Sequence, residues 1–388
     1  MESDKNTTFY PILGVTHNCN LNCLYCYQKH DTEHRMTFET AKTCIDWCFA
    51  NKPKDCEGIE FDFIGGEPLL EFNLIRKVVE YTLSKPHKEK LIFFATTNGT
   101  ILTDEMRKWF SENKDIFVLG LSLDGTPDVH NHNRCNSFEK IDIDFFLKTW
   151  PFQGIKMTLT EYSLKHLAES IKYLHSLGIE DIGGVNLFEG NFPWDDEKFV
   201  KLLIPQLNEL VDFYVENDDL KLNQMLDRNI QYCEAKEKRK SKWCGIGTGT
   251  IYFDTDGTRY PCQFATSMTF NENDLNKFCS QDFSKDEDFV DDYCYNNCYI
   301  YPVCNHCASA NFLTQKTFKV QDKSKCRIQK LVTLYSAEIQ ARRLVKNPDR
   351  YDEKTKYNLI NAIKNIKTLL LPEFSEYFEN SNSVLKND

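Results

Sequence analysis

The sequence predicts an α/β protein in which a partial (β/α)6 barrel of the TIM type is followed by a cysteine-rich domain. Short β-like runs alternate with helical patterns from Tyr10 to about Glu189, which is the pattern of parallel βα units. Six such units are too few to close an eight-stranded barrel, but right-handed crossovers between them give an open, curved one. The pattern by itself fits a flavodoxin-like sheet equally well. Cysteines become frequent again after Trp243, which marks the second part of the chain.

Six apolar runs are the expected strands of this barrel, and helical periodicity fills the gaps between them. The strands cover residues 10–16, 58–64, 91–96, 117–123, 155–160 and 182–188, and the helices cover 37–50, 70–84, 103–113, 139–150 and 164–177. Thr37 and Thr103 are the expected N-caps, and Gly178 is the expected C-terminal stop of the last of these helices. In such a barrel the active site lies at the carboxyl ends of the strands.

Helical segments are also predicted beyond the barrel. An amphipathic helix at 195–216 is expected to bridge two domains, and helices at 327–345 and 354–369 are expected to pack against the barrel. The predicted domains are an N-terminal tail (1–9), the barrel (10–190), a bridging helical segment (191–232), the cysteine-rich domain (233–330) and C-terminal helices (331–388). Because only nine residues precede the first strand, no N-terminal leader-binding domain is expected.

Composition argues against several classes of function. The 388 residues carry a formal net charge of −11, whereas sequence-independent binding of nucleic acid needs a cationic surface. No run of eighteen apolar residues is present, and the polar start lacks the apolar core of a signal peptide, so neither membrane insertion nor secretion is expected. We therefore expect a cytoplasmic protein, in which clustered cysteines bind metal rather than form disulfides. The expected substrate is a peptide or a small molecule.

Three cysteines follow the first strand in a C-x3-C-x2-C pattern, at Cys19, Cys23 and Cys26. A closed structural site normally takes four protein ligands, so three thiolates leave a position open for substrate or cofactor. Together with Tyr25, the pattern resembles the signature of the radical SAM (S-adenosylmethionine) enzymes. The resemblance implies that these cysteines hold a [4Fe–4S] cluster whose fourth iron binds SAM, and that the fold is the partial barrel of that family. The alternative is a set of loop cysteines that share no metal.

The turns after the second, third and fourth strands are candidates for binding SAM. In Gly65-Gly66-Glu67-Pro68 the glycines let backbone approach a ligand closely, and the carboxylate can accept from an ammonium group. In the radical SAM family this segment binds the amino group of SAM's methionine, and it matches here residue for residue. The resemblance also implies cofactor-binding roles for Asn98, for Ser122 and Arg134 at the methionine carboxylate, and for Asp124 at a hydroxyl. The alternative is ordinary turn chemistry, which also favours Asn-Gly and Asp-Gly after strands.

A second set of cysteines comprises Cys244, Cys262, Cys294, Cys298, Cys304, Cys307 and Cys326. The stretch 252–262 is typical of a hairpin, with an apolar strand, an Asp-Gly turn and a second strand that ends at a cysteine. The set resembles the SPASM extension of radical SAM enzymes, although two spacings in its second half depart from that pattern. The resemblance implies a cysteine-rich iron–sulfur domain, in which Cys244, Cys262 and Cys307 hold a first auxiliary cluster and Cys294, Cys298, Cys304 and Cys326 hold a second. Three [4Fe–4S] clusters and SAM are then the expected cofactors, and a double zinc ribbon is the alternative.

Four other residues bear on the reaction. Thr250 stands where some relatives supply a fourth thiolate, so the first auxiliary cluster is expected to have an open iron, unless Cys279 replaces the missing ligand. Gln263 stands where the sulfatase-maturating relatives have an aspartate base, and an amide cannot take a proton at neutral pH. Cys135 lies near the predicted SAM pocket and is a candidate catalytic residue that donates a hydrogen atom. The alternative for Cys135 is a structural thiol.

These features predict a radical SAM oxidoreductase that matures a ribosomally made peptide, a RiPP maturase. The resemblance implies hydrogen abstraction by the 5′-deoxyadenosyl radical, and our hypothesis for the product is a thioether crosslink in a cysteine-containing precursor peptide. The expected partners are a peptide or protein substrate, an electron donor such as flavodoxin or ferredoxin, and a separate leader-binding protein, with no nucleic acid and no membrane. One alternative is an anaerobic sulfatase-maturating enzyme, which converts Cys or Ser to formylglycine. An alternative of another class is a non-catalytic iron–sulfur or zinc protein.

Overall fold

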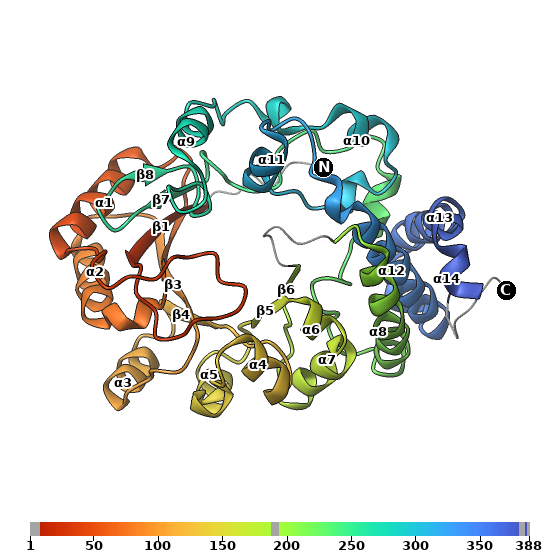
Figure 1. The fold of residues 1–388 in the computed structure, drawn as a ribbon, viewed down its shortest axis with the longest axis horizontal. Coiled ribbons are helices and arrows are strands. Elements are labelled where there is room, and N and C mark those ends of the chain that lie inside the picture. The colour runs from red at the N-terminus through yellow and green to blue at the C-terminus, as the bar shows by residue number, and fades with distance from the viewer. Residues whose placement is uncertain (1–7, 188–193, 380–384, 386–388) are drawn as a thin grey trace. The chain divides into compact units, whose positions relative to one another are not determined.

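The computed structural model describes residues 8–187, 194–379 and 385, which divide into two units (Figure 1). The first unit contains the described residues up to Leu123 together with His130–Gln153 and Trp243–Lys285. The second contains Asp124–Val129, Gly154–Lys242 and the described residues from Asp286 onward. Each unit therefore combines segments that lie far apart in the sequence.

A six-stranded sheet forms the centre of the first unit, in the order β4-β3-β2-β1-β7-β8. Its strands are β1 (Thr8–Thr16), β2 (Gly58–Gly65), β3 (Lys90–Thr97), β4 (Phe117–Leu121), β7 (Thr250–Phe253) and β8 (Arg259–Tyr260). All neighbouring strands are parallel except β7 and β8, which form an antiparallel hairpin. Because β7 pairs with β1, from Tyr10 opposite Thr250 to Leu13 opposite Phe253, a segment of the cysteine-rich region completes the sheet that the N-terminal strands begin.

Helices follow the strands of the first unit. They are α1 (Phe38–Asn51), α2 (Phe72–Ser84), α3 (Asp104–Glu112), α5 (Ile143–Thr149) and α9 (Glu272–Cys279), with 3₁₀ turns η1 (Pro68–Glu71) and η2 (Phe138–Lys140); α4 (Pro127–Asn133) has residues in both units. Both predicted N-caps are confirmed. The hydroxyl of Thr37 accepts from the N–H of Thr40 at 3.1 Å, and that of Thr103 accepts from the N–H of Met106 at 3.2 Å.

Aromatic side chains fill the space between this sheet and its helices. The rings of Phe63 and Phe117 stack with centroids 5.9 Å apart, and Phe93 stacks on Phe61 at 5.8 Å. All four are fully buried. Each contributes about 1.5–3 kcal/mol by leaving water, so this layer fixes the alignment of the strands whose carboxyl ends carry the candidate site.

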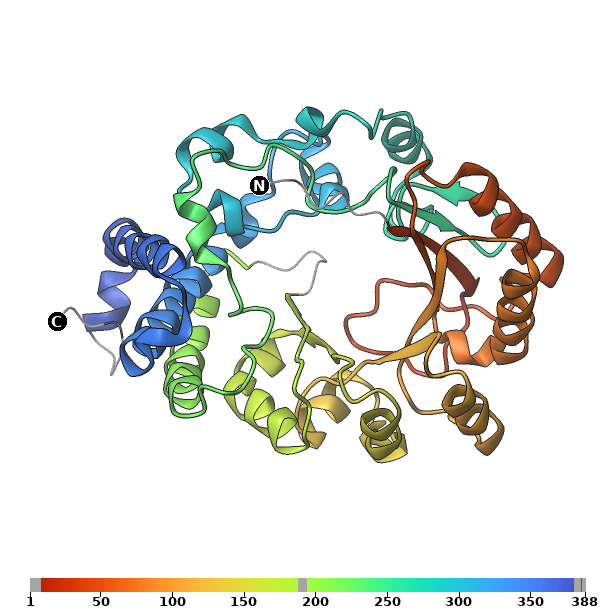
Figure 2. The same cartoon turned by 180° about the vertical axis from the view of Figure 1, so that it is seen from behind.

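The second unit contains a two-stranded parallel sheet and most of the helices. Its elements are β5 (Lys156–Leu159), β6 (Gly184–Leu187), α6 (Glu161–Leu164), α7 (Leu167–Ser176), α8 (Glu197–Glu216), η3 (Ile230–Glu234), η4 (Asp286–Phe289), α10 (Asp292–Asn297), η5 (Tyr301–Val303), α11 (Ala308–Gln315), η6 (Lys323–Lys325), α12 (Cys326–Lys346), η7 (Pro348–Arg350), α13 (Glu353–Leu370), η8 (Leu371–Phe374) and α14 (Ser375–Glu379). The α8, α12 and α13 helices lie side by side in both views (Figures 1 and 2). The hydroxyl of Tyr335 on α12 donates to Asn208 on α8 at 2.8 Å.

The α/β class and the mainly parallel sheet are confirmed, and all six predicted strands form within the described residues, with residue 188 outside them. Their pairing differs from one continuous run, because β1 to β4 lie in one sheet and β5 and β6 in another. The helix predicted at 164–177 forms as α7, and the short α6 precedes it. The helix predicted at 139–150 is shortened to α5 behind a 3₁₀ turn. The helix predicted at 70–84 begins as the 3₁₀ turn η1. The domain boundaries stay a prediction. Among the described residues, no helix is both long and apolar enough to cross a membrane.

Candidate active site and cysteine clusters

The loop that carries the first three cysteines follows β1 directly, in the first unit. The N–H of Cys26 donates to the carbonyl of Cys23 at 3.0 Å, and the N–H of Leu21 lies 3.4 Å from the sulfur of Cys19. The N–H of Leu24 donates to the carbonyl of Asn133 at 3.0 Å, which ties the loop to the last residue of α4. Burial raises the pKa of the Cys19 and Cys26 thiols, so an electropositive partner such as iron is needed to hold both as thiolates at neutral pH.

The two glycines of the Gly65-Gly66-Glu67-Pro68 turn lie against this loop. A Cβ atom at position 66 would lie 2.3 Å from the carbonyl oxygen of Asn18 and 2.8 Å from Cβ of Cys19. A Cβ atom at position 65 would lie 2.3 Å from the carbonyl oxygen of Thr16. Because positions 65 and 66 lack side chains, the end of β1 and the cysteine loop can pack directly against this turn. The sequence analysis did not predict this contact. The N–H of Gly66 donates to Thr16 and that of Glu67 to Asn18, at 3.0 and 2.9 Å.

Glu67 is buried at the carboxyl end of β2 and holds the ends of two strands together. Its Oε1 accepts from the N–H of Leu69 at 3.0 Å and from the hydroxyl of Thr97 at 2.8 Å. Its Oε2 accepts from the N–H of Asn98 at 2.7 Å. Burial raises the pKa of Glu67 to about 7 despite these donors. A carboxylate offers about four acceptor positions, so the three hydrogen bonds leave room for one more donor, such as an ammonium group.

Asn98 connects the end of β3 to the cysteine loop. Its side-chain Nδ2 donates to Oδ1 of Asn20 at 2.9 Å and lies 4.0 Å from the sulfur of Cys19. Its Oδ1 accepts from the N–H and hydroxyl of Thr100, at 3.0 and 2.7 Å. The structure thus brings the predicted residues Glu67 and Asn98 together beside the first cysteine.

The other predicted SAM residues lie on two units. Ser122 is buried after β4, and its N–H donates to the carbonyl of Thr97 at 2.9 Å. Arg134 is also buried, and its guanidinium lies 5.3 Å from the ring centroid of Tyr25, as in a cation–π pair. Asp124 belongs to the second unit, where its Oδ1 accepts from the N–H of Thr158 on β5 at 3.1 Å. Contact of these three with SAM stays a prediction.

Cys135, the candidate catalytic residue, lies in the first unit with the cysteine loop. Its thiol donates to the carbonyl of Asn22 at 2.9 Å. Cys135 and Asn136 both have a left-handed backbone, with φ of 57° and 52°. Such conformations cost energy for residues other than glycine and are frequent at functional sites. The thiol of Cys135 is exposed, and its catalytic role stays a prediction.

A histidine and an aspartate that the sequence analysis missed connect the cysteine loop to the hairpin. Nε2 of His17 lies 2.7 Å from Oδ1 of Asp254, which also accepts from the N–H of Thr255 at 2.8 Å. The hydrogen bond to Asp254 raises the pKa of His17. Although burial opposes it, the hydrogen bond with His17 holds the pKa of Asp254 below its usual range. The two residues are 237 positions apart, so no local pattern could have indicated the pair.

The predicted hairpin is confirmed, and it brings two cysteines of the second set into the first unit. Gly257 has φ of +84° in the turn between β7 and β8, and Cys244 and Cys262 flank the hairpin. The ring of Phe264 lies 5.7 Å from that of Tyr27, the residue after the loop cysteine Cys26. Burial, and secondarily the nearby Cys262, raise the pKa of Cys279 at the end of α9. Cys307 belongs to the second unit, so its grouping with the hairpin cysteines stays a prediction.

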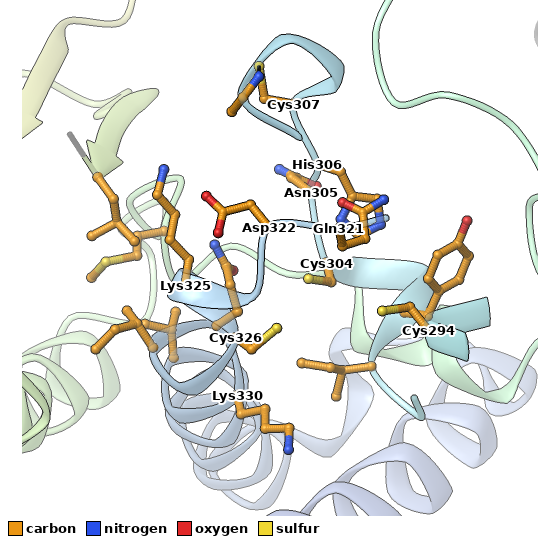
Figure 3. A pocket seen from close by; sticks show the side chains of 18 of the residues that line it. Cys294, Cys304, Asn305, His306, Cys307, Gln321, Asp322, Lys325, Cys326 and Lys330 are labelled. Atoms are coloured by element: carbon orange, nitrogen blue, oxygen red, sulfur yellow. Dashed lines mark hydrogen bonds between the residues drawn. The ribbon is translucent and has the colours of Figure 1, made fainter. Parts of the chain in front are cut away.

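A cavity of about 280 Å³ in the second unit is lined by five cysteines, Cys294, Cys298, Cys304, Cys307 and Cys326. Figure 3 shows the sulfur atoms of Cys294, Cys304 and Cys326 around one space, whereas Cys307 lies apart at the far end of its loop. Burial raises the pKa of Cys294 and of Cys304 to about 12. Every cysteine of the chain is a free thiol. Several thiols around one cavity fit an iron–sulfur cluster, which would hold them as thiolates.

Comparison with known proteins now gives the class. Residues 13–203 match the model of the Radical SAM superfamily. The chain is 31% identical over 277 residues to the uncharacterized protein MJ0907 of Methanocaldococcus jannaschii. The alignment covers 69% of this chain and 89% of that protein. The chain therefore belongs to the radical SAM superfamily. It is an enzyme of the kind that uses SAM and a [4Fe–4S] cluster. That the cysteine loop after β1 holds this cluster stays a prediction.

Two characterised groups resemble the chain. It is 28% identical over 281 residues to the cysteine-type anaerobic sulfatase-maturating enzyme of Clostridium perfringens, which covers 65% of this chain and 73% of that enzyme. It is 21% identical over 383 residues to the radical SAM cyclopropyl synthase TigE of Paramaledivibacter caminithermalis, which covers 88% and 75%.

Two solved structures share the fold. The native anSMEcpe structure with bound AdoMet superimposes with a TM-score of 0.65 at 19% identity, over 89% of this chain and 100% of that one. The structure of Streptococcus suis SuiB bound to the precursor peptide SuiA gives a TM-score of 0.53 at 14% identity, over 82% and 75%. The partial-barrel fold class with a cysteine-rich C-terminal region is thereby confirmed.

Proposed function

We propose that the enzyme modifies a ribosomally made peptide. The observation that carries this proposal is the combination, in one chain, of the radical SAM cysteine loop and a separate cavity lined by cysteines. The relatives support it, because their names describe enzymes that mature sulfatases or form cyclopropyl groups, and SuiB has been solved with a precursor peptide. A ribosomal peptide is therefore the substrate class that we assign to this chain.

The residues of the first unit have distinct roles in this proposal. Cys19, Cys23 and Cys26 would hold the cluster, with one iron left for SAM. Glu67 would accept a hydrogen bond from the methionine ammonium of SAM at its remaining position, and Asn98 would fix the loop through Asn20. When bound, cluster and SAM supply the 5′-deoxyadenosyl radical, which abstracts a hydrogen atom from an unactivated carbon. The protein contributes position and the exclusion of water.

Further parts of the proposal concern Ser122, Asp124 and Arg134 as SAM-binding residues and Cys135 as a hydrogen-atom donor. The second set of cysteines would hold two auxiliary [4Fe–4S] clusters, one on Cys244, Cys262 and Cys307, the other on Cys294, Cys298, Cys304 and Cys326. An electron donor such as flavodoxin or ferredoxin and a separate leader-binding protein complete the proposed partners.

For the product we propose a thioether between a substrate cysteine and a carbon atom. Thr250, the first residue of β7, supplies no thiolate where a fourth ligand could stand, and Gln263 cannot act as a base. A metal-bound thiol is deprotonated without a protein base, so these two substitutions suit a substrate cysteine. Co-expression with the precursor peptide followed by mass spectrometry tests this. A loss of two hydrogens that blocks alkylation of a cysteine supports the thioether, and a modified product whose cysteines all alkylate contradicts it.

A second candidate function is the oxidation of a sulfatase Cys or Ser to formylglycine. Its support is the 28% identity to the cysteine-type sulfatase-maturating enzyme. Gln263 in place of an acidic base argues against it. Incubation with a sulfatase peptide and SAM separates the two functions, because formylglycine forms an oxime with hydroxylamine and a thioether does not.

Iron content and SAM cleavage test the core of the proposal. We expect anaerobically reconstituted protein to bind about twelve irons, as three [4Fe–4S] clusters. Changing Cys19, Cys23 and Cys26 together to Ala should remove about a third of the iron and all SAM cleavage. Tightly bound zinc without iron-dependent colour would contradict the cluster assignment.

Affinity for SAM tests the role of Glu67. Glu67→Gln should weaken SAM binding by roughly ten- to a hundredfold, the equivalent of about 1.5–3 kcal/mol for a hydrogen bond with a charged group. Gln is preferable to Ala here, because Ala would leave Leu69, Thr97 and Asn98 without their acceptor. Unchanged affinity would show that the turn is only structural.

A further inference from the structure

Arg228 lines the cysteine cavity of the second unit and touches both segments that carry its sulfurs. Nη1 donates to the carbonyl of Val303, the residue before Cys304, at 3.3 Å, and to the hydroxyl of Thr333 at 3.1 Å. Nη2 donates to the side-chain oxygen of Gln329, and Nε to the carbonyl of Met225 at 3.1 Å. Gln329 and Thr333 lie on α12, whose first residue is Cys326.

All of these acceptors are neutral. In the described part of the chain, no carboxylate lies within 4.0 Å of the Arg228 guanidinium, which distinguishes it from Lys330 on the same cavity, paired with Glu373 at 2.6 Å. Asp322, the carboxylate that lines the cavity, caps η6 by accepting from the N–H of Ser324. Arg228 is half-buried, so its charge is partly withdrawn from water, which is costly unless an opposite charge compensates it.

The guanidinium nevertheless stays charged. Burial lowers the pKa of Arg228 to about 10, which is well above neutral, and the nearby Cys304 opposes that shift. The cavity is therefore cationic at Arg228 and lined by thiols that become anionic when they bind metal.

We propose that Arg228 is the fixed counter-charge of the cluster held by Cys294, Cys298, Cys304 and Cys326, and that it raises the reduction potential of that cluster. The proposal rests on the proposed auxiliary cluster. Four thiolates make an iron–sulfur centre anionic, and one-electron reduction adds a further negative charge. A nearby cation stabilises the reduced form more than the oxidised form, and net charge is among the factors that set such potentials. Arg228 is thus a positioning and tuning residue rather than a catalytic one.

The test isolates the second auxiliary cluster in the full-length chain. Changing Cys19, Cys23, Cys26, Cys244 and Cys262 to Ala removes the other two sites and should leave about four irons per chain. In this background Arg228→Gln is compared with Arg343→Gln by iron content and by anaerobic redox titration monitored by electron paramagnetic resonance. Arg343 is the matched control, because it is a buried arginine on α12 that donates to the carbonyls of Tyr214 and Leu220 and does not line the cavity.

We expect Arg228→Gln to shift the ratio of oxidised to reduced cluster at least tenfold at a fixed potential, which corresponds to a midpoint lower by about 59 mV. Arg343→Gln should leave the midpoint unchanged. If the background protein binds no iron, the proposal of a second auxiliary cluster is wrong. If it binds iron but Arg228→Gln leaves the midpoint unchanged, only the proposed role of Arg228 is wrong. Should Arg228→Gln lose its iron, Arg228→Lys decides: restored iron supports the counter-charge, and iron loss in both variants shows a purely structural residue.

Discussion

The imidazole Nε2 of His17 lies 2.7 Å from Oδ1 of Asp254 and thereby joins the N-terminal cysteine loop to the hairpin that leads to Cys262. His17 stands two residues before Cys19, and Asp254 directly follows β7. Both are buried, and both pKa shifts favour the charged pair. The cysteine loop after β1 is therefore held by a residue that directly follows the neighbouring strand β7, which comes from a distant part of the sequence.

We expect Asp254→Asn to destabilise the first unit by about 1.5–3 kcal/mol, because a charge-assisted hydrogen bond becomes a neutral one. Anaerobic denaturant unfolding of the metal-free protein measures this. Asp256→Asn is the control, since Asp256 lies exposed in the same turn and accepts from the N–H and the hydroxyl of Thr258. Equal stability of the two variants would show that the His17 pair contributes nothing.

Gly66→Ala should displace the cysteine loop, because the new Cβ would lie 2.3 Å from the backbone oxygen of Asn18, too close for both to keep their positions. We expect the variant to lose about a third of its iron and its SAM cleavage while it keeps the auxiliary clusters. Gly249→Ala is the matched control, since its nearest non-neighbouring atom would be 3.6 Å away. Full iron content in Gly66→Ala would contradict the close approach.

Glu67 should make the stability of the SAM-free protein depend on pH. Its folded pKa of about 7 exceeds the ordinary value of 4.5, so the folded state binds the proton more tightly than the unfolded state. The stabilising contribution is fully present below about pH 4.5 and is lost as pH rises through about 7, a change on the order of 3 kcal/mol. The measurement is the difference in unfolding free energy between about pH 4.5 and about pH 8. Glu67→Gln should abolish the contribution of Glu67 to this difference. The exposed Glu105→Gln should retain it, and an identical slope in both variants would refute the assignment.

Cys279→Ser tests whether the first auxiliary cluster has an open iron. We expect the variant to keep its full iron content and its product, because Cys279 is an exposed thiol at the end of α9 rather than a member of the proposed ligand set. Cys262→Ser, which changes a proposed ligand, should lose about a third of the iron. Iron loss in Cys279→Ser would make Cys279 the fourth ligand and remove the basis for the thioether.

Local sequence patterns predicted the features of the fold that depend on nearby residues. The capped helices and the strands appear where periodicity and Thr37 or Thr103 placed them, and the spacing of the first three cysteines predicted the family. Pairing between distant segments left no such signal. Thr250–Phe253 is a short apolar run that could pair with many strands. Its residues do not indicate that β1 is its partner. The roles of Gly66 and Arg228 likewise depend on what packs against them.

The pairing of β7 with β1 also sets the order in which the protein can be made. During synthesis β1 leaves the ribosome more than two hundred residues before Thr250 does, and until then one edge of β1 has no partner. An unpaired strand edge favours aggregation, and so distant a contact is slow to form. The hydrogen bond between His17 and Asp254 cannot form while Asp254 is still untranslated. We therefore expect iron to be inserted after translation, and we expect a chain that stops before Trp243 to be an aggregation-prone fragment rather than a shorter enzyme.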